Sequence, residues 1–182
     1  MKESKSANVS LLSDLDPGPQ APDIVRMIVE IPKNSANKYE YDATFGVFRL
    51  DRVLYSPVHY PGDYGFIPGM RAEDGDPIDV LCFVEQPSFP GCMIQVRLIG
   101  TLEMEDEGGV DRKVVGVPWR DPRYDQVLNI DDFPLHVRRE IEHFFGIYKE
   151  LEGKTVRVWG WRGVEVAGRA AQKSRERYLS NR

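Results

Sequence analysis

Three carboxylates lie within six residues of this sequence, in Asp74-Gly75-Asp76-Pro77-Ile78-Asp79, and an apolar run at residues 80–84 follows at once. Like charges this close raise one another's pKa, so a fold that keeps them together commonly balances them with a cation. Ligation by carboxylates alone favours a hard ion such as magnesium, manganese or calcium. The spacing therefore predicts a metal site at the start of a strand.

A calcium-binding EF-hand loop is one alternative for this turn. Asp74 and Asp76 fit its first and third positions, and Glu85 falls at the twelfth. Position five would be Ile78, which has no side-chain oxygen, and the glycine required at position six is Asp79. The EF-hand match therefore fails, and a simple solvated acidic loop is left as the second alternative.

A second acidic cluster spans residues 103–113 and contains Gly108-Gly109. Taken alone, such a charged Gly-Gly segment is typical of a solvated hairpin tip. If the two acidic turns end neighbouring strands, however, they could converge on one pocket and supply the carboxylates of a multi-metal centre. Basic and phenolic residues near the turns would then grip anionic oxygens, although each alone is typical of a surface charge or a core-edge tyrosine. These are Lys38, Arg52, Lys113, Lys149, Tyr60, Tyr64 and Tyr148.

The elements that must position these residues are mostly short strands. Segments rich in β-branched residues, separated by Gly and Pro, predict strands at residues 24–31, 38–42, 47–50, 79–84, 93–102, 113–117 and 155–161. Helical spacing of apolar residues predicts a helix from near Pro134 to Gly153 and a second at about residues 163–178. This order predicts a small β-barrel with helices on its flank.

Length and composition predict one globular domain at residues 23–182, preceded by a flexible or surface-wrapping arm at residues 1–22. No apolar run approaches the roughly 20 residues that cross a bilayer, and the first residues lack a secretory signal, so we expect a cytoplasmic protein without a membrane partner. Cys82 and Cys92 suit reduced core thiols. The net charge of −5 argues against a nucleic-acid partner.

The segment at residues 73–81, Glu-Asp-Gly-Asp-Pro-Ile-Asp-Val-Leu, resembles the signature of the family I soluble inorganic pyrophosphatases. Ordered matches continue from about residue 28 to residue 154. They include residues 29–32, 38–40, 51–52, 60–65, 106–113, 143–145 and 148–149. The amino-terminal arm is longer than the short lead usual in bacterial members.

The resemblance implies a mainly β fold, a five-stranded OB-like closed β-barrel with two flanking α-helices. It implies hydrolysis of inorganic pyrophosphate to two orthophosphates with several Mg²⁺ ions per active site, for which Mn²⁺ or Zn²⁺ could substitute. One catalytic metal would be held by Asp74, Asp79 and Asp111, and Asp79 would also reach a second metal. A substrate-associated metal would bind Asp106 and Asp111. The acidic cavity would be completed by Glu30, partly through water, and by Glu40.

The same resemblance implies that Asp76 is the general base and that Tyr64 borders the nucleophile. A water shared by two divalent ions loses its proton readily, a carboxylate can accept that proton, and the hydroxide attacks phosphorus in line. Tyr60 would lie in the cavity wall or contact phosphate. Phosphoryl oxygens would be bound by Lys38, Arg52, Lys113, Tyr148 and Lys149.

The resemblance also implies a homo-oligomer, with a hexamer as the leading expectation and a trimer or dimer as alternatives. A His pair one helical turn apart joins trimers in many bacterial hexamers; here His143 is present, but Ile147 stands four residues on. Two other functions stay open. One is a metal-dependent hydrolase of another phosphoanhydride, and the other is a non-catalytic OB-type binding module, which would predict a basic groove with stacking aromatics.

Overall fold

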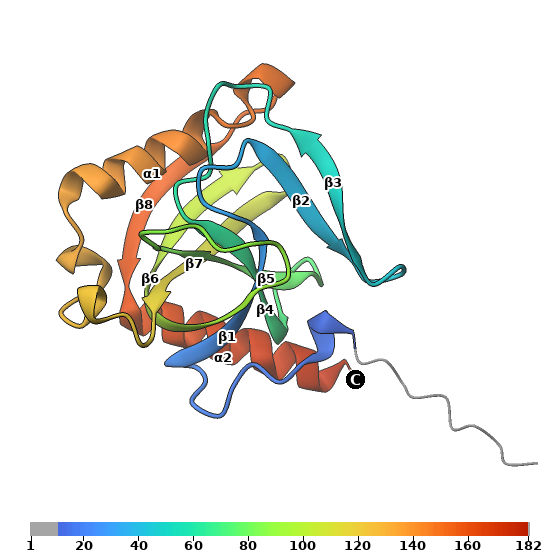
Figure 1. Ribbon diagram of the computed structural model, residues 1–182, viewed down its shortest axis with the longest axis vertical. Helices are drawn as coiled ribbons and strands as arrows, with labels where there is room; N and C mark the ends of the chain where they lie inside the picture. Colours follow the sequence, from blue (N-terminus) through green and yellow to red (C-terminus); the bar gives the residue numbers. More distant parts are fainter. Residues whose placement is uncertain (1–10, 182) are drawn as a thin grey trace, which may run out of the picture.

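The computed structural model describes residues 11–181 (Figure 1). Its strands are β1 (Ile24–Ile31), β2 (Asn37–Asp42), β3 (Val47–Val53), β4 (Asp63–Arg71), β5 (Pro77–Cys82), β6 (Met93–Asp106), β7 (Gly109–Pro118) and β8 (Arg157–Gly163). The α-helices are α1 (Leu135–Ile147) and α2 (Val164–Ser180). Short 3-10 turns are η1 (Leu12–Asp14), η2 (Pro122–Tyr124), η3 (Ile130–Asp132) and η4 (Glu150–Glu152).

Five strands close into a ring. β1 pairs with β4, β4 with β5, β5 with β7, β7 with β6, and β6 returns to β1; the β5–β7 pair is parallel and the others are antiparallel. β8 adds to the outer side of β6, and β2 and β3 form a separate hairpin that stands beside the ring (Figure 1). The architecture is the mainly β, OB-like barrel with two flanking helices that the sequence predicts.

Each helix covers its own apolar cluster. Ile141, Phe144 and Phe145 of α1 pack in the cluster that contains Tyr60 and Tyr64. The small residues Ala167, Ala170 and Ala171 of α2 pack in a second cluster, built largely from β-branched residues of the strands. Small alanines let the backbone of α2 approach the barrel closely. The two helices therefore pack at different places on the barrel, α1 behind the tyrosines and α2 against β4 and β6.

The strand β4 is not predicted by the sequence pattern, although eight of its nine residues are buried. Its sequence, Asp-Tyr-Gly-Phe-Ile-Pro-Gly-Met-Arg, contains two glycines and a proline, which ordinarily mark turns. Gly65 is needed here because a Cβ at this position would lie 2.0 Å from the carbonyl oxygen of Ile28 in β1. Close backbone approach thus replaces the alternating side-chain pattern that makes other strands recognisable.

The first helix is shorter in the structure than the sequence predicts. α1 ends at Ile147, and η4 follows, closed by Gly153 with φ of 73°. Tyr148 and Lys149 therefore lie at the break between the two. The second predicted helix matches α2 closely.

Residues 11–22 run along the surface of the barrel. The backbone N–H of Leu12 donates to the hydroxyl of Tyr41 at 3.2 Å, and the N–H of Arg26 donates to the carbonyl of Pro17 at 2.7 Å. The first ten residues of the predicted arm lie outside the described residues. Among the described helices, none is long and apolar enough to cross a membrane.

Both cysteines are free thiols. Cys82, at the end of β5, is fully buried, and burial raises the pKa of its thiol well above the usual value. Cys92 is half-buried in the loop before β6. This agrees with the sequence-based expectation of reduced core thiols.

Candidate active site

The parallel pairing of β5 with β7 brings the two acidic turns together. Val80 pairs with Val114, so Asp79 and Lys113, each one residue earlier, lie at the same end of the two strands. The first turn, residues 72–76, joins β4 to β5, and the second turn, residues 106–109, joins β6 to β7. Because parallel strands begin at the same edge of a sheet, both turns reach the same region.

A single cavity of about 1180 Å³ lies in this region. It is lined by every residue that the sequence proposes for the site, from β1, both strands of the hairpin, both acidic turns and the end of α1. These residues are Glu30, Lys38, Glu40, Arg52, Tyr60, Tyr64, Asp74, Asp76, Asp79, Asp106, Asp111, Lys113, Tyr148 and Lys149. Residues separated by more than 100 positions in sequence thus face one volume.

Lys113 is the most buried charge of the cavity. Its ammonium lies between the carboxylates of Asp79 and Asp111, and its Nζ is 2.7 Å from Asp111 Oδ1. Burial disfavours the charged form of Lys113, but the two carboxylates outweigh burial and raise its pKa. Burial raises the pKa of Asp111 despite this lysine. The group of three therefore holds one positive charge against two carboxylates in a poorly solvated place.

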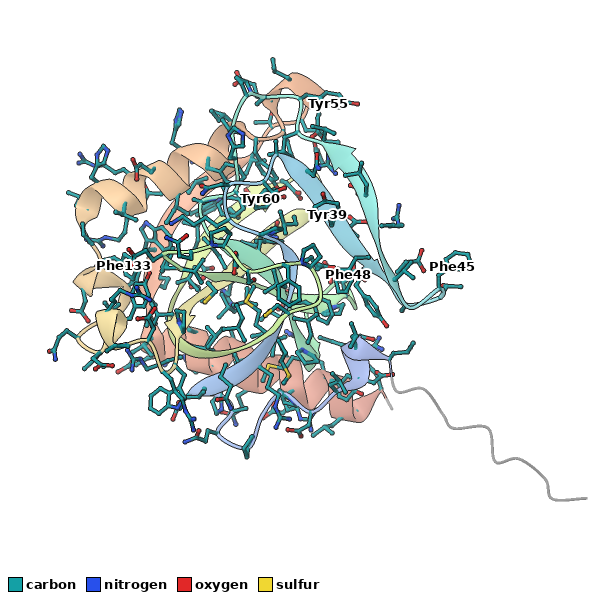
Figure 2. The ribbon with its side chains drawn as sticks, viewed as in Figure 1. Tyr39, Phe45, Phe48, Tyr55, Tyr60 and Phe133 are labelled. Atoms are coloured by element: carbon teal, nitrogen blue, oxygen red, sulfur yellow. The ribbon has the colours of Figure 1, made fainter. Side chains whose placement is uncertain are left out.

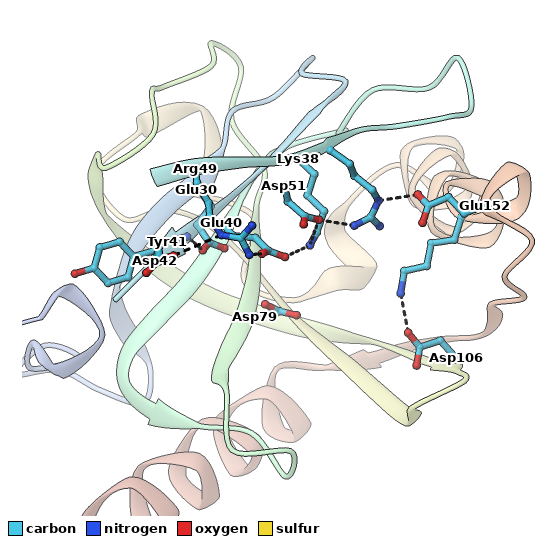
Figure 3. Close-up of polar contacts among 12 residues, drawn as sticks. Glu30, Lys38, Glu40, Tyr41, Asp42, Arg49, Asp51, Asp79, Asp106 and Glu152 are labelled. Carbon is cyan, nitrogen blue, oxygen red and sulfur yellow. Dashed lines mark hydrogen bonds and ion pairs between the residues drawn. The ribbon is translucent and has the colours of Figure 1, made fainter. Parts of the chain in front are cut away.

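Lys149 pairs with Asp106, the carboxylate at the start of the second turn. Its Nζ is 2.7 Å from Asp106 Oδ2, a contact drawn as a dashed line in Figure 3, and the ammonium also lies 5.3 Å from the ring centre of Tyr148. The hydrogen bond from Lys149 lowers the pKa of Asp106. The break after α1 thus places a cation at the second turn.

The β2–β3 hairpin supplies the opposite wall, and its charged residues form a connected network (Figure 3). Lys38 pairs with Glu40 and lies 3.4 Å from Asp51. Arg52 donates to Asp51 at 2.6 Å and to Glu152 of η4 at 2.8 Å. Burial opposes the charged form of Arg52, but these two carboxylates raise its pKa. The network fixes both cations on the cavity side of the hairpin.

Glu30 of β1 reaches the same cavity from the barrel. Its carboxylate accepts a hydrogen bond from the backbone N–H of Tyr41 at 2.7 Å, which joins β1 to the hairpin (Figure 3). Burial raises the pKa of Glu30 to about 7, and the negative charge of Asp79 adds to the effect. Burial and nearby negative charge therefore disfavour the ionised form of Glu30, which additional positive charge would stabilise.

In the first turn, Asp74 and Asp76 have no ion pair within residues 11–181. The N–H of Asp76 donates to Asp74 Oδ1 at 3.0 Å, and Gly75 between them has φ of 94°, a conformation that suits glycine. Partial burial, Asp74 and Asp79 raise the pKa of Asp76. Asp76 is therefore better able to accept a proton than an ordinary aspartate.

Three buried tyrosines form the floor. The rings of Tyr60 and Tyr64 lie 5.4 Å apart, and Tyr60 points into the molecule (Figure 2). Burial raises the pKa of Tyr60, Tyr64 and Tyr148. Each hydroxyl therefore stays protonated and can donate a hydrogen bond to an anion. By contrast, Phe45 at the tip of the β2–β3 hairpin is 77% exposed and points away from the cavity (Figure 2).

The donor set fits a hard divalent cation. Every candidate ligand is a carboxylate, and two of them, Glu30 and Asp111, have raised pKa values because they are buried among like charges. Within residues 11–181, no three acidic, histidine or cysteine side chains lie close enough to form a ready metal cage, and Lys113 lies between Asp79 and Asp111. A cation held by both Asp79 and Asp111 would therefore take the place of the Lys113 ammonium between them.

Two residues of the charge network were not proposed from the sequence. Asp51 holds Lys38 and Arg52, and Glu152 holds Arg52 from a position 100 residues away. Asp51 is itself part of the matched pair Asp51-Arg52, so the sequence contained a signal for it. Glu152 lies among several charged residues and carries no signal in the sequence.

The fold and cavity define a class of protein: a small closed β-barrel whose single acidic cavity also presents lysines, an arginine and tyrosine hydroxyls, a combination suited to cations and phosphate oxygens together. A family model for inorganic pyrophosphatase matches residues 27–179. The match extends beyond residue 154, where the recognisable motifs end, and includes nearly all of α2.

Comparison with individual proteins agrees. The inorganic pyrophosphatase of Geobacillus stearothermophilus is 48% identical over 155 residues, which cover 85% of this chain and 94% of the relative. The crystal structure of inorganic pyrophosphatase from Thermus thermophilus superimposes with a TM-score of 0.91 at 47% identity, covering 93% of this chain and 99% of that one. The Helicobacter pylori inorganic pyrophosphatase gives a TM-score of 0.87 at 39% identity, covering 91% and 98%. The chain belongs to the inorganic pyrophosphatase family, and this membership implies a divalent metal cofactor.

Proposed function

We propose that the protein hydrolyses inorganic pyrophosphate to two orthophosphates with Mg²⁺, by direct in-line attack of a water-derived hydroxide. The observation that carries the proposal is the convergence of all the candidate carboxylates, cations and tyrosines on one cavity. Family membership supports the substrate, and a carboxylate-only donor set supports magnesium.

We propose that the carboxylates divide the metal sites among them. The sites would be formed by Asp74, Asp79 and Asp111, with Asp79 shared, by Asp106 and Asp111 together with substrate, and by Glu30, with Glu40 in the same acidic wall. The common contact of Asp79 and Asp111 with one lysine supports their assignment to a single site. When bound, divalent ions lower the pKa of water and offset charge on phosphoryl oxygens.

Asp76 would accept the proton of the attacking water. It lies in the cavity, has a raised pKa and has no ion-pair partner among the described residues, so its charge is not already committed to a cation. A general base works best when its pKa approaches the working pH. Tyr64, whose hydroxyl stays protonated, would border the attacking water and orient it.

The cations on both walls would bind the phosphoryl oxygens. Arg52 and Lys38 lie on the hairpin, whereas Lys113 and Lys149 lie at the second turn, so an anion in between would be held from two sides. Cations placed in advance stabilise charge that develops on a leaving phosphate. Tyr148 would add a hydroxyl donor, and Tyr60 would form the wall or contact phosphate.

Orthophosphate release from pyrophosphate tests the function, measured with Mg²⁺ and with Mg²⁺ replaced by a chelator. ATP and a phosphate monoester serve as comparison substrates. We expect rapid hydrolysis of pyrophosphate alone, dependent on Mg²⁺. Hydrolysis of ATP at a similar rate would support a broader phosphoanhydride hydrolase, and metal binding without any hydrolysis would support a binding module.

The tryptophans favour a small substrate over a nucleotide. Trp119, Trp159 and Trp161 are absent from the residues that line the cavity. Trp119 instead stacks with Arg97, and Trp159 with Arg157. None of the three tryptophans therefore offers a nucleotide base a stacking surface in the cavity.

We also propose that the protein is a homo-oligomer, with a hexamer preferred and a trimer or dimer as alternatives. On α1, His143 is exposed and Ile147 is half-buried, so the helix presents a mixed polar and apolar face. Sedimentation of the full chain, and of a variant with Ile147→Asp, tests this. Loss of the larger species in the variant supports an α1 interface, and a monomeric parent protein excludes it.

A further inference from the structure

We propose that Arg71, backed by Tyr178 of α2 and Asp14 of the amino-terminal segment, is a positioning residue that fixes the first acidic turn for metal binding and proton transfer. The inference rests on the proposed function of that turn. It concerns residues 72–76, whose aspartates otherwise have no ion-pair partner among residues 11–181.

The first link is a contact to the peptide between the two aspartates. Arg71 Nη1 donates to the carbonyl oxygen of Gly75 at 3.3 Å. Gly75 lies between Asp74 and Asp76 and has φ of 94°. Because glycine has no side chain, its backbone dihedral angles are little restricted. A donor fixed on this carbonyl therefore limits how both neighbouring carboxylates point into the cavity.

The second link holds Arg71 itself. Its guanidinium lies 5.9 Å from the ring centre of Tyr178, and the guanidinium of Arg175 lies 5.5 Å from the same ring. Tyr178 is only 5% exposed. A cation on a buried aromatic face loses less to water than an exposed one, so the ring sets the direction of Arg71.

The third link anchors Tyr178 to the amino-terminal segment. Its hydroxyl donates to Asp14 Oδ1 at 3.0 Å, across 164 positions of sequence. Figure 1 shows η1 beside the carboxyl end of α2, below the ring. Asp16 adds an ion pair with Arg175 at 3.6 Å, and Arg175 also donates to the carbonyl of Gly69 in β4 at 2.9 Å. The amino-terminal segment therefore holds α2 against β4, the strand that leads into the first acidic turn.

A contact of lesser weight supports the same arrangement. Arg177 donates to Glu73 at 2.8 Å, but Glu73 is largely exposed, so this ion pair is screened and contributes little. The backbone bond from Ala72 N–H to Asp76 O, at 2.7 Å, closes the turn. The turn is therefore closed by its own backbone but oriented by Arg71.

The test compares Arg71→Ala, Arg71→Lys and Tyr178→Phe with the parent protein. Arg169→Ala is the matched control because Arg169 lies on α2, as Tyr178 does, is exposed, and has its one ion pair within residues 11–181 with Glu165, at 3.8 Å. Divalent metal affinity is measured directly by calorimetry with Mg²⁺ and Mn²⁺, without substrate. Turnover and the half-saturating Mg²⁺ concentration are measured separately.

We expect Arg71→Ala to weaken metal binding about three- to tenfold and to lower kcat by a similar factor, as for loss of one hydrogen bond that orients two groups. Arg71→Lys should recover part of the loss, because a cation and one donor remain. Tyr178→Phe keeps the ring but loses the bond to Asp14, so a two- to threefold effect is expected. Arg169→Ala should stay within twofold of the parent.

Parent-like metal binding in Arg71→Ala, or a fall in thermal stability with unchanged metal binding and kcat, would overturn the proposal. If Arg71→Ala does not fold, Tyr178→Phe decides in its place by the same two measurements. A parent protein that binds metal but does not hydrolyse pyrophosphate refutes the proposed function alone, since the calorimetry still decides whether Arg71 positions the turn.

Discussion

The two acidic turns deliver carboxylates to one cavity in opposite electrostatic states. In the second turn and the strand after it, Asp106 and Asp111 are paired with Lys149 and Lys113. In the first turn, Asp74 and Asp76 have no ion pair among the described residues, and the pKa of Asp76 is raised, whereas that of Asp106 is lowered. Residues that look equivalent in the sequence are thus prepared for different tasks.

The difference follows from topology. The second turn lies at the tip of the long β6–β7 hairpin, where the end of α1 brings Lys149 against it. The first turn lies between β4 and β5, and its cation, Arg71, contacts a backbone carbonyl rather than a carboxylate. A carboxylate without a fixed cation is easier to protonate, whereas the ion pair with Lys149 lowers the pKa of Asp106. Asp111 differs, because burial raises its pKa despite its pairing with Lys113. We therefore propose that proton transfer depends on Asp76 of the first turn, where Asp74 would hold metal, and that the second turn mainly binds charge.

The largest expected effect is that of Asp76→Asn. If Asp76 accepts the proton of the attacking water, kcat should fall by about 10²- to 10⁴-fold, which is the usual contribution of a general base. Thermal stability and metal binding should stay close to those of the parent protein. Pyrophosphate turnover at saturating Mg²⁺ is the measurement, with Glu73→Gln in the same turn as control. Near-normal turnover would remove Asp76 from the role of base.

Lys113→Met should produce the next largest effect: kcat should fall, whereas metal binding should become tighter. Removing a placed donor to a phosphoryl oxygen should lower kcat by about 10²-fold. Because the substitution also frees Asp79 and Asp111 from their shared ammonium, metal binding in the absence of substrate should become tighter. Calorimetry with Mg²⁺ and turnover at saturating Mg²⁺ give the two values. Weaker metal binding would show that Lys113 supports the carboxylates rather than competing with metal.

Gly75→Ala and Gly109→Ala compare the turns directly. Gly75 has φ of 94° and Gly109 has φ of 107°, and a Cβ at either position meets nothing within 4 Å. Each alanine should therefore cost about 1–2 kcal/mol of stability through backbone strain alone. For a protein of this size that lowers Tm by about 2–4 °C per kcal/mol.

Activity should separate these two variants although their stabilities match. Gly75 lies between Asp74 and Asp76, so a changed backbone there redirects both carboxylates, and kcat should fall. Gly109 begins β7, two residues before Asp111, and the lysine pairs restrain that side of the cavity. Equal losses of activity in both variants would contradict the view that the first turn is the more geometrically sensitive one.

The sequence pattern predicts most of the strands and both helices, but it misses β4. β1 is rich in β-branched residues and lies between two prolines, and it has the predicted bounds in the structure. β4 does not show in the pattern, because it contains Gly65, Pro68 and Gly69 in place of a regular alternation of side chains. Gly65 permits a close approach to β1, and Gly69 permits a close approach to Leu15 and Arg175. β4 pairs with β5, which follows it directly, but also with β1, which lies well before it in the sequence.

The site divides in the same way. The carboxylates could be proposed because they gather in two short turns, and the structure places all of them in the cavity. Glu152 and Tyr178 could not be proposed, since they act through contacts that span 100 and 164 positions of sequence. Arg71 could not be proposed because its bond to the carbonyl of Gly75 depends on how the turn folds. Spacing identifies groups that share a turn; it carries no information on the cation that reaches the turn from another element.

The smallest expected difference is between adjacent residues of the second turn, Asp106 and Glu107. Spacing alone gives no reason to prefer either carboxylate, although the family resemblance names Asp106. In the structure Asp106 lines the cavity and pairs with Lys149, whereas Glu107 is exposed and does not line the cavity. Glu107→Gln should therefore leave kcat and the half-saturating Mg²⁺ concentration within twofold of the parent. Asp106→Asn should raise that Mg²⁺ concentration with a smaller change in kcat, because it removes a charge that binds and not one that accepts a proton. If Asp106→Asn instead lowers kcat as much as Asp76→Asn, the two turns share the proton transfer and the division between them is wrong.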